Sequence, residues 1–362
     1  MYYYESTTTD PYENLAIEEH LFETLPAGAG LFMLWQNSDA VIVGKYQNTA
    51  EEIHAAYVRE HGVAVVRRMS GGGAVYHDLG GLNYTLILDE ESPDAADQDA
   101  VWRQCMAPLL AVLRSYGLDA QFSGRNDILA RSPRAAADDG GAVGDDAADD
   151  WRKIAGCAQY SRGSRTLHHG CILFDTDLEK VAAALTPGEA KFVSRSDKSV
   201  AARVTTIRAC LVGMRVQTPE TAEGAEGEAR QPVTMDQFRQ DLRQAYGTSV
   251  PYALSAEDLD AIRRLRDEKY RTWEWNYGFR ADYDVKKVRR FEAGTVQAEM
   301  TVRGGRIEEV RFSGDFFADS DLTELETALQ EQPLDEHLVD KLLEKEYIRG
   351  VSAMELMRLL TE

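Results

Sequence analysis

The chain has 362 residues, 44% of them hydrophobic, so it can bury a substantial core, and we expect one large domain plus a smaller one. A formal net charge of −21 excludes the basic footprint that non-specific nucleic-acid binding needs. No apolar run has transmembrane length and the first residues do not resemble a leader peptide, so we expect no membrane attachment. Four cysteines without CxxC spacing indicate reduced thiols and a cytoplasmic location.

The first predicted elements are a helix and a hairpin. Ile17, Leu21 and Leu25 recur at four-residue spacing, which predicts a helix over 14–25. Apolar segments at 31–35 and 40–43 flank a polar turn and are typical of paired strands. We expect the same sheet to continue through further strands, followed by an amphipathic helix; the segments are 63–68, 73–76 and 82–88 for the strands and 101–116 for the helix.

A run of three glycines, Gly71 to Gly73, directly follows the segment Arg67-Arg68-Met69-Ser70. Glycine permits positive φ and brings bare N–H groups close to a ligand, and arginine forks suit phosphate or carboxylate. The run is not a Walker loop, because no Gly-Lys-Ser/Thr follows and no helix begins there. Alone, it is more typical of a glycine turn with two surface arginines. The later motifs make an anion-binding cradle the better interpretation.

The second half contains two polar interruptions and a change of character. Residues 132–150 and 218–231 consist largely of Ala, Gly, Asp and Glu, which predicts solvated loops. Paired strands are predicted at 153–160 and 165–174. Helices are predicted at 177–185, from residue 234 onward, and in a segment that includes 259–265. A small α+β module is predicted at the C-terminal end. Its expected elements are strands at 295–302 and 307–312 and helices near 322–329, 338–343 and 352. We predict a catalytic domain over 1–248 and an accessory domain over 256–362.

Seven motifs occur in order along most of the chain. They are Asn14-Leu15-Ala16-Ile17-Glu18-Glu19, Leu34-Trp35-Gln36-Asn37, Arg67-Arg68-Met69-Ser70-Gly71-Gly72-Gly73-Ala74-Val75, Ser123-Gly124-Arg125-Asn126-Asp127, Arg152-Lys153-Ile154-Ala155-Gly156, Leu167-His168-His169-Gly170 and Trp273-Glu274-Trp275-Asn276-Tyr277-Gly278. The ordered set resembles the lipoate–protein ligase A family, part of the biotin/lipoate ligase and octanoyltransferase superfamily. As an ordered set it is far more specific than any single motif.

The resemblance implies an α+β fold, with a large mixed or antiparallel-sheet catalytic domain of the biotin/lipoate ligase type and a small α+β C-terminal accessory domain. It also implies two reactions: lipoate (or octanoate) and ATP, with Mg²⁺, form an acyl-adenylate, and a lysine of an acceptor then takes the acyl group. The implied acceptors are lipoyl domains of 2-oxoacid dehydrogenase E2 subunits or the glycine cleavage H protein. Such an enzyme would salvage free lipoate, and we expect a monomer.

By the same resemblance, three motifs supply the contacts to ATP and lipoyl-AMP. Lys153 is predicted to be the catalytic group, an electrostatic clamp on the acyl carbonyl and α-phosphate rather than a nucleophile. Asp127 is either a Mg²⁺ ligand or an ordinary turn aspartate. The neighbours His168 and His169 should point to opposite faces of a strand, so a zinc site is not expected there. The full predicted contact set is Arg68, Ser70, Gly72, Gly73, Ala74, Val75, Tyr76, His77, Asn126 and Lys153.

Lipoate also needs a narrow apolar tunnel, and an acidic acceptor needs a surface that can receive it. The tunnel candidates by resemblance are Leu15, Ile17, Trp35 and Val43, although each is also typical of an ordinary core. Because lipoyl domains tend to be acidic and this chain is strongly acidic, we expect a local basic face around the acceptor entrance. That face is predicted to contain Arg162, Arg165, Lys191, Arg195, Lys198, Arg203 and Arg208.

Three other interpretations remain open at this point. An octanoyl or lipoyl transferase of the same superfamily would need no ATP and would form a thioester on Cys157 or Cys171. Such cysteine-dependent members generally lack the accessory domain predicted here, and buried free thiols are usually packing residues. Biotin ligation is the same chemistry on a different acid. A non-enzymatic lipoate-binding protein would require the Arg68 and Lys153 motifs to be vestigial.

Overall fold

The structure of the protein is a computed structural model. It describes residues 1–89, 98–123, 126–131, 151–185, 203–216, 232–248, 250–277, 285–303, 306–333, 342, 345 and 347–361. The two predicted acidic loops, at 132–150 and 218–231, lie outside these ranges, as does most of the predicted helix at 338–343. Within the described part of the chain, no helix is both long and apolar enough to span a bilayer.

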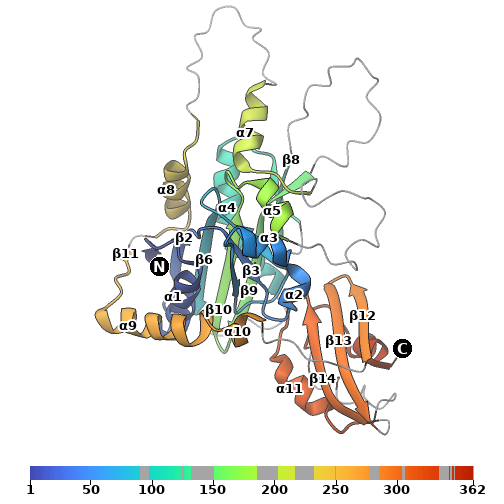
Figure 1. Ribbon diagram of the computed structural model, residues 1–362. Coiled ribbons are helices and arrows are strands. Elements are labelled where there is room, and N and C mark those ends of the chain that lie inside the picture. The colour runs from blue at the N-terminus through green and yellow to red at the C-terminus, as the bar shows by residue number, and fades with distance from the viewer. Residues whose placement is uncertain are drawn as a thin grey trace, which may run out of the picture.

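Eight of the described strands form one large mixed sheet in the order β11-β1-β2-β6-β10-β9-β8-β7 (Figure 1). β1 runs parallel to β11 and β2, and the remaining neighbours are antiparallel. The predicted pairing of 153–160 with 165–174 is confirmed as β9 with β10. The bounds are β1 (Tyr2–Glu5), β2 (Leu31–Trp35), β6 (Leu82–Asp89), β7 (Ala120–Phe122), β8 (Asp127–Arg131), β9 (Trp151–Arg162), β10 (Arg165–Ile172) and β11 (Val250–Pro251).

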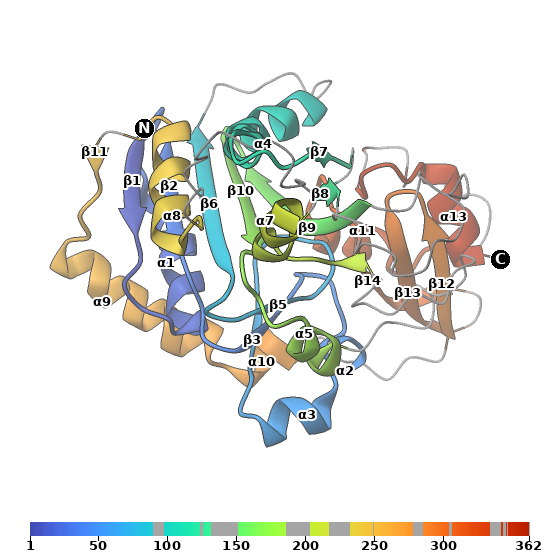
Figure 2. The same cartoon turned by 90° about the horizontal axis from the view of Figure 1, so that it is seen from above.

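The two faces of this sheet pack different layers, because alternate residues of a strand point to opposite sides. Phe32 and Leu34 of β2 pack in one cluster with α4 (Gln98–Ser115), α7 (Ile207–Val216) and α8 (Met235–Ala245). Leu31, Met33 and Trp35 pack on the other side, against α1 (Pro11–Thr24). Figure 2 shows α4, α7 and α8 together over the first face. The sheet is thereby buried on both faces, as its fully buried strand β2 requires.

A second sheet of three strands carries the glycine run. β3 (Ala40–Val43) pairs in parallel with β4 (Ala64–Arg67) and antiparallel with β5 (Val75–His77). The predicted hairpin of 31–35 with 40–43 is therefore wrong: both strands form, but they belong to different sheets. In the connection between them, the buried Asn37 side chain accepts a hydrogen bond from Nδ2 of Asn14 on α1. The remaining helices of this region are α2 (Thr49–Glu52), α3 (Ala55–Glu60) and α5 (Leu178–Ala184).

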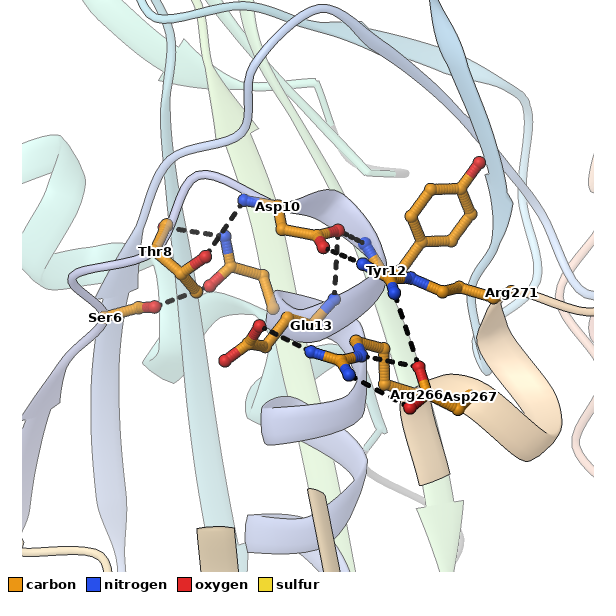
Figure 3. Close-up of polar contacts among 9 residues, drawn as sticks. Ser6, Thr8, Asp10, Tyr12, Glu13, Arg266, Asp267 and Arg271 are labelled. Carbon is orange, nitrogen blue, oxygen red and sulfur yellow. Dashed lines mark hydrogen bonds and ion pairs between the residues drawn. The ribbon is translucent and has the colours of Figure 1, made fainter. Parts of the chain in front are cut away.

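A helical segment after β11 packs back onto α1. It consists of α9 (Ala256–Leu265), the π-helix η3 (Arg266–Tyr270) and α10 (Trp273–Tyr277). Asp10 caps the start of α1 through the N–H of Tyr12 and also pairs with Arg271, while Glu13 pairs with Arg266 (Figure 3). These contacts join the segment to the catalytic sheet region. We therefore propose the domain boundary between α10 and the next strand, later than the predicted position.

The C-terminal domain is a three-stranded antiparallel sheet with helices on it, seen in orange and red in Figure 1. Its described elements are β12 (Val285–Phe291), β13 (Gly294–Arg303), β14 (Arg306–Gly314), α11 (Leu322–Leu329) and α13 (Ala353–Thr361). The loop after β14 touches the glycine run: the N–H of Gly72 donates to the carbonyl of Phe316 at 2.9 Å. The ring of Phe316 stacks on Tyr46, with centroids 5.5 Å apart.

Candidate active site

A cavity open to solvent lies between the two sheets of the catalytic domain, where the glycine loop faces β9 and β10. One part of its wall is apolar and contains Leu15, Trp35 and Ile42; another part carries Lys153. The full lining is Leu15, Trp35, Ile42, Arg68, Gly73, Ala74, Val75, His77, Asn83, Asn126, Lys153, Gly156, Cys157, Ala158, His169, Gly170 and Cys171.

Lys153 on β9 reaches the cavity beside a carboxylate of the neighbouring strand. Its Nζ lies 2.7 Å from Oδ1 of Asp127 on β8. Gly156 makes room for this side chain, since a Cβ there would lie 2.6 Å from Nζ. Burial works to lower the pKa of Lys153, but the Asp127 carboxylate and the nearby cysteine sulfurs outweigh it and leave the pKa above its usual value. Lys153 is therefore a fixed cation at neutral pH.

Arg68 supports the glycine loop from within. Its Nη2 donates to the carbonyls of Gly71 at 2.6 Å and Gly73 at 2.9 Å, its Nη1 to Ile42 at 3.1 Å and its Nε to Ser70 at 3.0 Å. Sequence reasoning assigned Arg68 a fork for phosphate, but these bonds direct the guanidinium at the loop. Burial lowers the pKa of Arg68 to about 10, so it is still cationic at neutral pH. It thus supplies positive charge to the cavity while holding the loop's shape.

Ser70 lies behind the cavity wall, in a buried chain of polar groups. Its Oγ is 2.6 Å from His169 Nε2, and His169 Nδ1 is 2.8 Å from Oε1 of Glu18 on α1. The order resembles a serine–histidine–acid triad. However, Ser70 is fully buried, does not line the cavity and accepts the Arg68 bond, so it orients Arg68 and His169 instead of attacking a substrate.

A second polar chain fixes His77. The Nδ2 of Asn14 donates to Asn37 Oδ1 at 2.9 Å, so the amide nitrogen of Asn37 faces His77 Nδ1, 3.1 Å away. Nδ1 is then an acceptor and Nε2 carries the hydrogen. Burial, followed by the charges of Arg68 and His169, lowers the pKa of His77 to about 3. His77 is a neutral donor in the cavity wall.

Strand alternation explains which predicted residues line the cavity and which do not. Tyr76 points away from its neighbours Val75 and His77 and packs with Val43 in the core on the far side of the small sheet. Ile42, not predicted, takes the position in the wall that was assigned to Val43. Asn83, Ala158 and His169 were also missed. Predicted residues that the structure places outside the lining are Ile17, Val43, Ser70, Gly72 and Tyr76, while Asp127 contacts Lys153.

Four of the seven residues expected in a basic face are described, and three of these four pair with carboxylates. Arg165 is the first residue of β10 and Arg208 lies near the other end of that strand, and each pairs with an acidic partner, Asp89 and Asp175 respectively. Arg162 likewise pairs with Glu23. Neighbouring carboxylates therefore offset part of the charge of these three arginines. The predicted members Lys191, Arg195 and Lys198 lie outside the described residues.

His168 and His169 point to opposite faces of β10, as predicted. The Nε2 of His168 lies 2.9 Å from Tyr84 Oη, in the core behind the cavity. Burial, and then the neighbouring His169, lowers the pKa of His168 to about 3.

We expect this buried histidine to make folding sensitive to mild acid. Its pKa in the folded state lies below the unfolded value of about 6.5. The stabilising contribution is therefore complete above pH 6.5 and decreases as the pH falls toward 3, by at most about 1.4 kcal/mol per pH unit. The free energy of unfolding between pH 7.5 and 5 should change less in His168→Gln than in the wild type or in the exposed control His61→Gln. An equal change in all three would contradict the burial argument.

The chain matches two family models. Residues 10–246 match the lipoyl protein ligase A/B catalytic domain, and residues 280–360 match the bacterial lipoate protein ligase C-terminus. The protein therefore belongs to the lipoyl protein ligase family. It is an enzyme of the lipoate–protein ligase type, with the catalytic and C-terminal domains in one chain.

Curated relatives agree along most of their length. Lipoate–protein ligase 1 of Staphylococcus aureus is 35% identical over 360 residues, which cover 98% of this chain and 97% of the relative. Lipoate-protein ligase LplJ of Bacillus subtilis is 33% identical over 341 residues, 92% of this chain and 91% of the relative.

Solved structures show the same fold. The LipL1 structure of P. falciparum, in complex with lipoate, has a TM-score of 0.68 at 19% identity, over 99% of this chain and 98% of that one. A lipoate-protein ligase A structure bound with ATP has a TM-score of 0.54 at 22% identity, over 77% of this chain and 100% of that one. The predicted fold class, a large mixed-sheet catalytic domain with a small α+β domain, is confirmed.

Proposed function

We propose that this enzyme uses ATP to activate free lipoate or octanoate as the acyl-adenylate and passes the acyl group to a lysine of a lipoyl domain. The observation that carries this proposal is one cavity with an apolar part, at Leu15, Trp35 and Ile42, and a fixed cation, Lys153. An acyl chain and the charged groups of an adenylate need these two environments side by side. The ATP-bound and lipoate-bound relatives support the choice of substrates.

The first step brings two anions together, the acyl carboxylate and the α-phosphate. Lys153 lowers that repulsion, and Asp127 keeps its ammonium protonated and aimed. The backbone at Gly73 to Val75 approaches the same space, and His77 offers its Nε2–H. These groups are held in place before substrate enters, so little reorganisation opposes the reaction.

Mg²⁺ fits this site only as an ion that arrives with ATP, whose phosphate charge it would neutralise. Among the described residues, no three His, Cys, Asp or Glu side chains gather as a metal site. Asp127 can offer one carboxylate, which suits the preference of Mg²⁺ for few protein ligands plus phosphate oxygens. Because Asp127 is already paired with Lys153, it would have to serve both cations.

The thioester alternative is disfavoured by the cysteines themselves. Cys157 and Cys171 both line the cavity, but burial raises the pKa of each thiol. Cys157 also lies 3.2 Å from the hydroxyl of Tyr84, inside the core. A nucleophilic cysteine needs thiolate character, which this environment opposes.

The test is the mass of a purified apo lipoyl domain after incubation with the enzyme, lipoate and Mg²⁺, with and without ATP. We expect lipoylation only with ATP, and we expect it to persist in Cys157→Ser and Cys171→Ser. Glycine cleavage H protein, tested in parallel as acceptor, distinguishes the two predicted acceptor classes. Transfer from octanoyl-carrier protein without ATP, lost in either cysteine variant, would instead establish the transferase.

A further inference from the structure

We propose that Trp275 and Asn276, on α10, are positioning residues for the glycine run Gly71 to Gly73, which is called the nucleotide loop from here on. This inference rests on the proposed function. Both act on Arg67, the last residue of β4. Asn276 Oδ1 accepts from the Arg67 backbone N–H at 2.8 Å, and Trp275 Nε1 donates to the Arg67 carbonyl at 2.8 Å. Both backbone groups immediately before Arg68 are therefore held by side chains of a segment more than two hundred residues later.

The Arg67 side chain continues the connection into a neighbouring loop. Its Nε donates to the carbonyl of Trp275 at 2.9 Å, and its Nη1 donates to the carbonyls of Gly44 at 2.8 Å, Lys45 at 3.0 Å and Gln47 at 2.7 Å. The residue is only 3% exposed and does not line the cavity. Arg67 is thus a connector between α10 and the loop at 44–47, not a ligand for phosphate.

That loop lies against the glycine run. The N–H of Lys45 donates to the carbonyl of Ser70 at 2.8 Å. Gly44 is so close to the run that a Cβ would meet the carbonyl oxygen of Gly72 at 2.0 Å. A displacement of α10 would therefore move the loop at 44–47 through Arg67, and this loop would in turn displace Ser70 and Gly72. Arg68 would follow, because it donates to carbonyls of the glycine run.

α10 is itself well anchored, so it can serve as a reference point. Asn276 Nδ2 donates to the carbonyls of Tyr270 at 2.6 Å and Thr272 at 2.9 Å. Tyr270 and Lys269, on the π-helix, both contact the carboxylate of Glu19 on α1. The same segment clamps the start of α1 in Figure 3. π-helical turns often mark functional positions, and here the turn sets the place of Asn276.

The test compares Trp275→Phe with Trp273→Phe, a matched change on the same helix at a residue 57% exposed. Trp275→Phe removes the Nε1–H bond to Arg67 but keeps an aromatic ring between Tyr270 and Lys269. In assays of lipoyl-AMP formation we expect Trp275→Phe to raise the KM for ATP about 5- to 10-fold, the value of one lost hydrogen bond. The KM for lipoate should stay within about twofold, because the bond lies behind the nucleotide loop.

Asn276→Ala should raise the KM for ATP further, because it removes the acceptor for the Arg67 N–H. Equal increases in both KM values, or a lower melting temperature with unchanged kinetics, would overturn the positioning role. If the wild-type enzyme forms no lipoyl-AMP, the proposed function fails. If the wild type forms it and Trp275→Phe matches Trp273→Phe, only the positioning role fails.

Discussion

Replacing Lys153 with methionine is expected to lower the rate of lipoyl-AMP formation by about 10²- to 10³-fold, the usual cost of removing one preorganised charge-stabilising donor. Methionine keeps most of the volume of the lysine stem and deletes the ammonium. The loss should appear mainly in kcat, because the charge matters most when the carboxylate approaches the α-phosphate. Pyrophosphate release with lipoate and ATP measures it directly.

Two further variants separate the loss of the Lys153 ammonium from the effect of leaving Asp127 without its partner. Lys180→Met is the matched control, since Lys180 also pairs with an aspartate, Asp39, but is 40% exposed outside the cavity. Lys153→Met with Asp127→Asn removes both charges of the cavity pair. If the single variant were slow only because an unpaired Asp127 repels the substrates, the double variant would recover activity. We expect it to stay slow.

The opposite result has a clear meaning. A Lys153→Met enzyme that forms lipoyl-AMP at the rate of Lys180→Met would remove the fixed cation from the proposed chemistry. The cavity would then need another group for charge neutralisation. Arg68 is the remaining described cation in the lining, and its bonds to Gly71 and Gly73 direct it toward the loop.

Local sequence patterns were sufficient to predict whether most segments are helices or strands, but not to predict which strands pair. The spacing of Ile17 and Leu21 predicts α1 because a helix repeats every 3.6 residues. The strands β2 and β3 were predicted correctly as strands and wrongly as a pair, because β2 pairs with β1 and β6 while β3 pairs with β4 and β5, and local spacing does not identify these partners. β12 was missed because lysine and arginine occupy both its half-buried and its exposed positions, so no apolar alternation appears.

The site shows the same division between local and distant information. The period of two, applied to 75–77, separates Val75 and His77 from Tyr76, so that part of the lining was predictable. The roles of Ser70 and Arg68 were not, because they depend on Glu18, His169 and Ile42, which other elements bring into contact. Sequence spacing holds no signal for such contacts, and the same is true of the carboxylates that pair with Arg162 and Arg165.

Replacing Gly44 with alanine is expected to cost about 3 kcal/mol of folding free energy, the upper end of the usual cost of overpacking, and to abolish most adenylate formation. The added Cβ would sit 2.0 Å from the backbone oxygen of Gly72, and backbone atoms cannot rotate away as a side chain can. The φ of Gly44 is not in the left-handed region, so the penalty is a steric one and not backbone strain. The clash must push the glycine loop out of place. Thermal unfolding and lipoyl-AMP formation measure the two consequences.

Gly73→Ala is the matched comparison for this steric argument. Gly73 belongs to the glycine run that Gly44 contacts, also has no positive φ, and its added Cβ would find only Asp315 Cβ, at an ordinary 3.8 Å. Its folding free energy should therefore change by less than about 1 kcal/mol. If Gly44→Ala is as stable as Gly73→Ala, the loop at 44–47 does not press on the glycine run. A large difference would show that the shape of the nucleotide loop depends on a neighbour outside the cavity, which is also what the proposed role of Arg67 and α10 requires.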